Sequence, residues 1–332
     1  MVLREKMLLF SKIKYKEVFS INNDELHVVL GAFGATGQAV VKELLSRNLK
    51  VRAVERTKTV PIVETINADL LDLNQTVNAI KGATYVYLCV GIKYSSKLWK
   101  DEWPIIMDNV ISSCEAAKAK LIFFDNVYMY GPSPLKVPFD EAHTQKPISQ
   151  KGIVRKKITD TLIKAHKVGR VKTVIGRSAD FYGPNAVNSP FYISFLERIL
   201  LGKAPQTLGK IDIKHTYSYS LDSGRALVAL ALDESTYGQV WHLPVSEPIT
   251  IEEVILKFNK ILDTSFKVSM MPRPLLGIMG RLVPPIKEMR EMLYQFDETY
   301  IMSYSKFKKH FPDFKVTTLD DGIRAMIDSF KH

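Results

Sequence analysis

The sequence of 332 residues has little cysteine and no long apolar run. Its two cysteines, Cys89 and Cys114, cannot form a disulfide framework and lack the spacing of a metal site. No apolar stretch approaches the roughly 20 residues that a membrane-spanning helix requires. The apolar patch MLLF near the N-terminus is bounded by charged residues and makes a poor secretory signal. We therefore expect a cytoplasmic protein without a membrane partner.

Acidic residues are also in the minority, because 46 Lys and Arg face 35 Asp and Glu, for a net charge of +11. Such an excess can indicate binding to a polyanion. The basic residues are scattered, however, apart from residues 151–172 and the stretch FKKHF near the C-terminus. No basic motif with interleaved aromatic residues is present. The charge therefore favours a solvated surface that attracts a phosphorylated small molecule, and we expect no nucleic-acid partner.

Short β-branched runs alternate with longer amphipathic segments, one of which predicts a helix over 103–119. This alternation predicts an α/β fold of the Rossmann type, a doubly wound parallel sheet covered by helices on both faces, over residues 26–182. The pattern then becomes mixed, which predicts a smaller substrate-binding domain over 183–332, with about 211–243 partly returning to the first domain. We interpret residues 1–25 as an N-terminal extension.

Three glycines directly follow the first predicted strand and open the first helix, in the stretch HVVLGAFGATG. Glycine at such positions allows a tight turn and a close approach of the backbone, and the helix N-terminus offers free amides to a pyrophosphate. In this context the motif predicts dinucleotide binding, and a glycine-rich turn without a ligand is the less favoured alternative. The residues of the predicted loop are Gly31, Phe33, Gly34, Ala35, Thr36 and Gly37.

The GxxGxxG spacing resembles the extended branch of the short-chain dehydrogenase/reductase superfamily, the NAD-dependent epimerase/dehydratase-like proteins. The segments ADLLD, YLCVGI, NVYMYGP, RSADFYGP and YGQVWHLP extend the resemblance over most of the chain. It implies an NAD(P)-dependent oxidoreductase or epimerase acting on a small carbonyl or sugar-like substrate. It also implies that Asp69 and Leu70 meet the adenine, that Val90 and Gly91 pass under the cofactor, and that Ser178 belongs to the cofactor site.

The end of the second strand bears on which dinucleotide is used. Glu55 is placed to accept a hydrogen bond from an adenosine ribose hydroxyl, which favours NAD. Arg56, with Lys58 close by, could pair with a 2′-phosphate, and NADP users of this family often carry arginine nearby. The sequence favours NADP and leaves NAD open.

The family's catalytic residues are replaced in this sequence. Relatives carry Ser or Thr five residues before the glycine of a Val-Tyr-Gly segment, and Tyr-x-x-x-Lys on a helix about 25 residues later. Counting back from Gly131 gives Asn126, and counting on from there gives Lys151. Lys151-Gly-Ile-Val-Arg155 therefore stands where Tyr-x-x-x-Lys is expected. The resemblance implies catalytic roles for Asn126, Lys151 and Arg155, with Tyr128 as a possible substitute proton donor.

The replacements leave two kinds of function open. Lys151 could exchange a proton only if its ammonium gave up its charge near neutral pH, which a basic neighbour such as Arg155 promotes. Arg155 can hold ribose hydroxyls but cannot act as an acid or base near pH 7. Asn126 can hydrogen-bond a substrate carbonyl. The alternatives are an enzyme with an altered proton relay, which the second domain favours, and a catalytically silent dinucleotide-binding regulator or redox sensor.

Other residues have weaker assignments. Asn109 resembles a helix-borne asparagine of the family but lies several residues too close to the next strand. His143 is favoured as a solvated loop residue, whereas for His215 substrate contact and a structural role are equally open. The helices around 99–118 and 149–168 correspond to those through which relatives form dimers, so we expect a homodimer.

Overall fold

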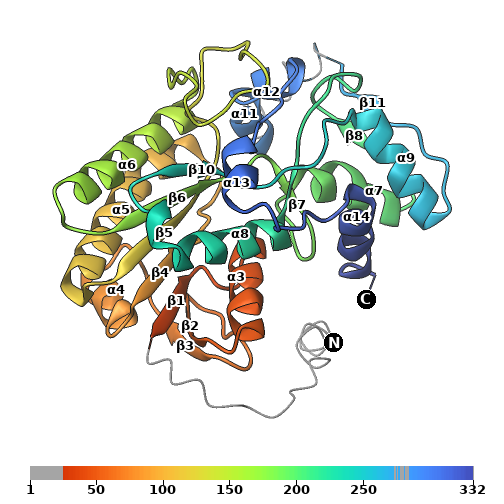
Figure 1. Cartoon of the computed structure of the whole chain (residues 1–332). Helices are drawn as coiled ribbons and strands as arrows, with labels where there is room; N and C mark the ends of the chain where they lie inside the picture. The colour runs from red at the N-terminus through yellow and green to blue at the C-terminus, as the bar shows by residue number, and fades with distance from the viewer. Residues whose placement is uncertain (1–24, 273, 275, 277–279, 281–283, 332) are drawn as a thin grey trace.

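The computed structural model describes residues 25–272, 274, 276, 280 and 284–331, so all but the last residue of the predicted N-terminal extension lies outside the described residues. A sheet of seven parallel strands organises the chain, in the order β10-β6-β5-β4-β1-β2-β3 (Figure 1). The predicted doubly wound parallel sheet is confirmed. The strands are β1 (Leu26–Leu30), β2 (Lys50–Glu55), β3 (Glu64–Asn67), β4 (Tyr85–Leu88), β5 (Lys120–Asp125), β6 (Thr173–Arg177) and β10 (Val240–His242).

Helices cover both faces of this sheet (Figure 1). The helices α4 (Leu73–Ile80), α5 (Ser96–Ala117) and α6 (Gln150–Lys167) cover one face, and α3 (Ala35–Ser46) and α8 (Ser220–Leu232) cover the other. None of the described helices has the length and apolar character needed to cross a bilayer.

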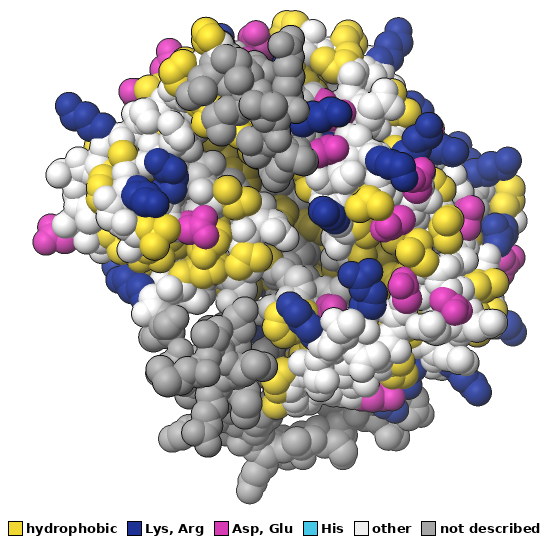
Figure 2. All heavy atoms as spheres, turned by 180° about the vertical axis from the view of Figure 1, so that it is seen from behind, with side chains coloured by type: hydrophobic (Ala, Val, Ile, Leu, Met, Phe, Trp, Pro, Cys, Tyr) yellow, Lys and Arg dark blue, Asp and Glu magenta, His cyan; other side chains and the backbone are white. Residues whose placement is uncertain are grey.

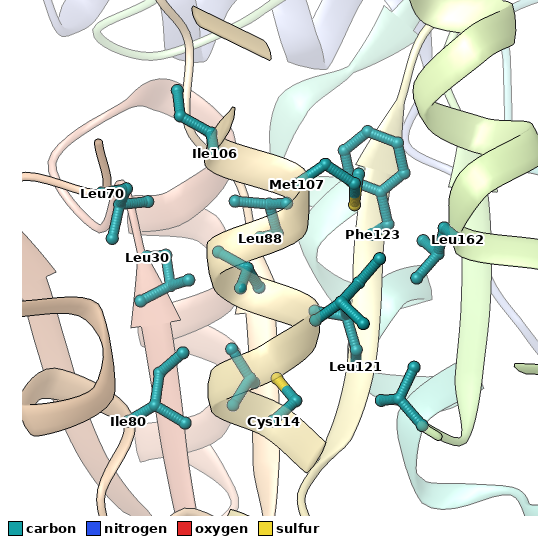
Figure 3. Packing of buried hydrophobic residues seen from close by; sticks show 14 of the residues in the cluster. Leu30, Leu70, Ile80, Leu88, Ile106, Met107, Cys114, Leu121, Phe123 and Leu162 are labelled. Atoms are coloured by element: carbon teal, nitrogen blue, oxygen red, sulfur yellow. The ribbon is translucent and has the colours of Figure 1, made fainter. Parts of the chain in front are cut away.

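The central strand shows why the sequence folds in this way. All five residues of β1 are buried, as expected for a parallel strand with helices on both faces. Side chains alternate along a strand, so Val28 and Leu30 pack under α5 while Val29 packs under α3 and α8. Figure 3 shows Leu30 in the first of these clusters, near Leu88 of the neighbouring strand β4.

Helix α5 differs from its predicted bounds. It begins at Ser96, seven residues before the predicted start at 103, and it contains Pro104 in its interior. Proline removes one helical hydrogen bond and normally costs about 3 kcal/mol in a helix interior. The buried rings of Trp99 and Trp103, one turn apart with centroids separated by 6.4 Å, anchor the first two turns to the core. Tertiary packing therefore overrides the local signal.

The remaining elements lie mostly beside the sheet (Figure 1). A third apolar cluster joins the helices η1, α9 and α14 with the strands β7 and β9. These elements are β7 (Phe181–Tyr182), the π-helix η1 (Phe191–Leu196), α7 (Glu197–Leu200), β8 (Gln206–Thr207), β9 (Ser218–Tyr219), the 3₁₀ helix η2 (Glu234–Thr236), α9 (Ile251–Leu262), β11 (Ser269–Met270), α11 (Pro284–Arg290), α12 (Tyr294–Asp297), α13 (Ser305–His310) and α14 (Leu319–Asp328).

Charged side chains are interspersed on the face shown in Figure 2, where Lys and Arg alternate with Asp and Glu. No continuous basic stripe of the kind that follows a nucleic-acid backbone is visible on that face.

The contact between α3 and α8 yields a stability prediction. A Cβ added at Gly224 would lie 2.5 Å from the Cβ of Ala39, so the two helices approach as closely as glycine allows. We expect Gly224→Ala to lower the free energy of unfolding by about 1–3 kcal/mol through overpacking, measured by urea denaturation. Gly91→Ala is the control, because a Cβ there meets no atom within 4 Å. Equal stability of the two variants would contradict the prediction.

Candidate dinucleotide and active site

The three loop glycines meet different constraints. Gly31 has φ +79°, and a Cβ there would lie 2.8 Å from the Cα of Val90. A Cβ on Gly37 would lie 2.1 Å from the carbonyl oxygen of Gly31. The protein's own backbone therefore requires these two glycines. At Gly34 the nearest atom would be that same oxygen at 3.4 Å, so this position has room for a side chain and carries none.

Helix α3 begins directly at this bare position. Gly34 is its N-cap residue, and no side chain accepts a hydrogen bond from the first turn. The amides of the first turn therefore keep their capacity to bind an anion, which the positive end of the helix dipole also favours. The loop fits a pyrophosphate at the N-terminus of α3.

Glu55, at the end of β2, is tied to the same loop. Its carboxylate accepts a hydrogen bond from the backbone N–H of Phe33. The Lys58 ammonium lies 4.0 Å from the centroid of the Phe33 ring. Arg56 is exposed and forms no ion pair with another described residue. Glu55 and Lys58, which both bear on the choice of dinucleotide, therefore contact Phe33.

The segment expected to meet the adenine is held by internal hydrogen bonds. The Oδ1 atom of Asp69 accepts from the backbone N–H of Leu71 at 3.0 Å, and Leu70 is buried. The side-chain amide of Asn109 donates to the carbonyl oxygen of Leu70 at 2.8 Å. Asn109 thus connects α5 to this loop.

Three neighbouring strands bring further sequence-predicted residues to one edge. Val90 and Gly91 follow β4, Asn126 follows β5, and Ser178 follows β6. Ligands of open parallel sheets bind at this carboxyl edge. The Asn126 Oδ1 accepts from the Tyr128 backbone N–H at 3.1 Å, and its amide nitrogen has no partner among the described residues. The Ser178 hydroxyl is committed, because it donates to the next carbonyl group at 2.8 Å.

Lys151 is fully buried at the start of α6. Its Nζ lies 2.5 Å from Glu288 Oε2, 2.8 Å from Glu291 Oε1 and 2.9 Å from Ser96 Oγ. An ammonium has three protons, so these acceptors use all of them. In this arrangement Lys151 has no proton left to offer a substrate.

The two glutamates also cap two helices. The carboxylate of Glu288 accepts the backbone N–H of Ser96 at 2.7 Å, at the start of α5. The carboxylate of Glu291 accepts the backbone N–H of Gln150 at 3.3 Å, at the start of α6. Burial alone would raise the pKa of Glu288, but hydrogen bonds from Lys151 and Ser96 outweigh it and hold this pKa below its usual value. We call Lys151, Ser96, Glu288 and Glu291 the lysine clamp, which joins α11 to α5 and α6.

Arg155 lies one turn further along α6 and is also buried. Its Nε is 2.9 Å from Asp125 Oδ1, and the same carboxylate receives Arg177 Nε at 3.2 Å. The guanidinium lies 4.7 Å from the centroid of the Trp103 ring. Its Nη1 has no hydrogen-bond partner among the described residues, so one donor remains available.

Tyr128 is half-buried in the loop after β5 and stacks on Trp99, with centroids 6.2 Å apart. Burial raises its pKa, and the negative charge of Asp180 raises it further. The hydroxyl is protonated at neutral pH, as in any tyrosine. The raised pKa makes it a weaker acid than a free tyrosine, yet still a stronger acid than an alcohol, so it can give its proton to an alkoxide. Tyr130, two residues on, instead bonds Arg177 Nη1 at 2.8 Å and His242 Nε2 at 2.6 Å inside the core.

The two histidines considered from the sequence lie in different settings. His215 is buried, its Nε2 lies 3.2 Å from Asp180 Oδ2, and its ring stacks with those of Phe296 and Tyr300. His143 is partly exposed and contacts the carbonyl oxygen of the following residue through Nδ1 at 3.1 Å.

Sequence reasoning missed the acidic partners. Glu288 lies in the short helix α11 and Glu291 directly follows it, and no local pattern connects them with a lysine more than 130 residues earlier. Asp125 and Asp180 had a detectable signal, because each is an acidic residue at or just after the end of a buried strand.

The family follows from a comparison of the sequence with family models. Residues 27–242 match the model of the NAD dependent epimerase/dehydratase family. The match covers more than half of the chain, so the protein belongs to this family. No curated protein has a significantly similar sequence.

Solved structures share the fold at low sequence identity. The Bordetella bronchiseptica enzyme WbmH, in complex with NAD⁺, superposes with a TM-score of 0.74 at 17% identity, covering 93% of this chain and 99% of that chain. The Bacillus cereus UDP-glucuronic acid 4-epimerase, in complex with NAD, gives 0.74 at 18% identity, covering 92% and 98%. The Thermus thermophilus UDP-glucose 4-epimerase complex with NAD gives 0.73 at 20% identity, covering 92% and 99%.

The lysine clamp yields a second stability prediction. Lys151→Met would leave two partly exposed carboxylates without their cation, so we expect a loss of about 1–3 kcal/mol in the free energy of unfolding. Adding Glu288→Gln and Glu291→Gln should recover part of that loss, since it removes the unpaired charges. Lys157→Met, at an exposed position of the same helix, is the control. Urea denaturation of the four proteins is the measurement, and a Lys151 variant as stable as the control would refute the clamp.

Proposed function

We propose that this protein is an NAD(P)-binding oxidoreductase of the epimerase/dehydratase type, acting on a small carbonyl or sugar-like substrate with a non-standard active site. The proposal rests mainly on the loop at the N-terminus of α3. Gly31 and Gly37 are required by contacts with the backbone. Gly34 has room for a side chain, and its lack of one leaves the amides of the first helical turn accessible to an anion. A turn with no ligand has no need of glycine at that position.

The chain offers groups for each part of a dinucleotide. The pyrophosphate belongs at the first turn of α3, the adenine at Asp69 and Leu70, and the nicotinamide half along Val90 and Gly91. The free Nη1 of Arg155 is a donor for ribose hydroxyls. The bound nicotinamide supplies or accepts a hydride.

Tyr128 is the proposed donor of the proton that the substrate carbonyl oxygen receives. Asn126 directs its free amide toward a substrate carbonyl oxygen, and the Tyr128 hydroxyl donates the proton. Lys151, which occupies the usual donor position, keeps the helix ends together through the clamp and has no free proton.

NADP is the favoured dinucleotide. Arg56 is exposed and unpaired among the described residues, which leaves its guanidinium free for a 2′-phosphate. The Glu55 carboxylate already accepts from Phe33, which supports the loop whichever dinucleotide binds.

A catalytically silent dinucleotide-binding regulator is the second candidate. The burial of Lys151 and Arg155 in ion pairs favours it, because both residues at the usual catalytic positions are engaged by the protein itself. In either case the substrate or effector belongs between the sheet edge and residues 183–332, with 211–243 returning to the sheet through α8 and β10.

The proposed assembly is a homodimer of a cytoplasmic protein. Ile105 on α5 and Ile153 on α6 are 47% and 46% exposed, which leaves apolar side chains on the outer surface of this helix pair. A second copy would cover them.

Cofactor titration tests the binding half of this proposal. We expect NADPH to bind and Gly34→Val to abolish binding, because a side chain would fill the space of the pyrophosphate. Arg56→Ala should weaken NADPH about tenfold or more while leaving NADH nearly unchanged. Isothermal titration calorimetry measures both affinities. Absence of affinity for any pyridine dinucleotide, oxidised or reduced, would overturn the function as a whole.

Turnover separates the two candidates. We expect Tyr128→Phe to lower kcat about 100-fold or more through loss of the proton donor, with the NADPH affinity unchanged. Tyr192→Phe, in η1, is a control for the loss of a tyrosine hydroxyl, because this hydroxyl has no hydrogen-bond partner among the described residues. If NADPH binds but no aldehyde, ketone or nucleotide sugar oxidises it, the regulator is the correct function.

A further inference from the structure

Asp180 is an acidic residue at the predicted substrate edge that the cofactor does not use. It lies three residues after the end of β6, next to the strand whose end carries Asn126. Its backbone is fixed, because its carbonyl oxygen accepts the Ser218 N–H at 2.9 Å. Its Oδ2 meets His215 Nε2 at 3.2 Å, whereas its Oδ1 has no donor among the described residues. The carboxylate is therefore held in place with one oxygen left for a ligand.

Aromatic side chains pack around His215, the partner of this carboxylate. His215 stacks on Phe296 and Tyr300, and the Tyr300 hydroxyl lies 3.4 Å from the carbonyl oxygen of Val127, next to Tyr128. The negative charge of Asp180 raises the pKa of Tyr128 and of Tyr294, after burial as the larger cause in each. The side chain of Asp180 is 13% exposed. It therefore lies in a largely dry setting close to the proposed proton donor, where electrostatic interactions are strong.

The basic residues along this edge are committed to other acids. Lys151 is paired with both Glu288 and Glu291, so the clamp carries an excess negative charge. Arg155 shares the carboxylate of Asp125 with Arg177. His215 is therefore the one basic group that contacts Asp180 among the described residues. The two arginines at Asp125 leave one excess positive charge, which balances the clamp, so the unpaired Oδ1 of Asp180 decides the local preference. A phosphate or carboxylate placed against this oxygen would meet like charge, whereas an ammonium would pair with it.

We propose that Asp180, oriented by His215, is a specificity-determining residue that binds an ammonium group of the substrate. The inference rests on the proposed function and names its substrate class, a small amine-bearing carbonyl compound or amino sugar. It departs from the nucleotide sugars named for the similar structures, whose diphosphates would require cations at this edge.

A matched set of carbonyl compounds tests the inference on the whole protein. Aminoacetone, hydroxyacetone and pyruvate place an ammonium, a hydroxyl and a carboxylate on the same three-carbon scaffold. We expect the kcat/KM of NADPH oxidation to be about tenfold or more higher for aminoacetone than for hydroxyacetone, and lowest for pyruvate. As a second measurement, glucosamine should bind the NADPH complex more tightly than glucose, measured by the fluorescence of the bound cofactor.

Asp180→Asn should remove the preference for the amine in both pairs and leave the NADPH affinity unchanged. Asp212→Asn, an exposed residue with the same change of charge, should keep it. The substrate pairs need no variant, so they remain decisive if Asp180→Asn does not fold. The inference is overturned if neither amine is favoured over its neutral partner, or if UDP-glucose binds more tightly than the amines. Failure of NADPH itself to bind would instead count against the proposed function.

Discussion

The buried ammonium of Lys151 is the contact on which the arrangement of the site depends. It brings together the starts of α5 and α6 and the short helix α11, which are far apart in the sequence. A buried cation is costly unless it is paired, and two carboxylates with a hydroxyl satisfy it here. The same carboxylates cap the backbones of both long helices. One cluster therefore fixes α11 against the starts of α5 and α6, and Lys151 acts in it as a structural anchor.

Charge pairing elsewhere along the edge determines which groups remain for a ligand. Asp125 receives both Arg155 and Arg177, so these three side chains stabilise one another inside the sheet layer. The groups left over are the amide of Asn126, one oxygen of Asp180 and the phenol of Tyr128. Each follows the end of β5 or β6, and ligands bind at this edge of a parallel sheet. The proposed function therefore places the chemistry on the strand-end loops and not on α6.

How much could be predicted from the sequence depended on the range of the interactions. The sheet was predictable because buried parallel strands are marked by local apolar runs. The glycine loop was predictable because Gly37 packs on Gly31 within the loop, although Gly31 also contacts the distant Val90. Helix α5 began earlier than predicted, since the packing of Trp99 and Trp103 outweighs the local effect of Pro104. The partners of Lys151 were not predictable, because Glu288 and Glu291 reach it only through the tertiary fold. The nearby Arg155 suggested that Lys151 is reactive. In the structure, Glu288 and Glu291 pair with the Lys151 ammonium instead.

The same balance of charges bears on the direction of reaction. A phenol removes a proton from an alcohol only after losing its own, and burial together with Asp180 keeps the pKa of Tyr128 raised. Arg155 lowers this pKa, but it is a smaller cause than burial and is itself paired with Asp125. In the proposed reaction Tyr128 therefore gives its proton, at neutral pH, to a carbonyl oxygen whose carbon receives the hydride. That requirement of the proposed reaction favours carbonyl reduction by NADPH over alcohol oxidation by NADP⁺. An ammonium bound at Asp180 would offset the negative charge that disfavours a developing substrate oxyanion, and it would at the same time reduce the effect of Asp180 on the pKa of Tyr128.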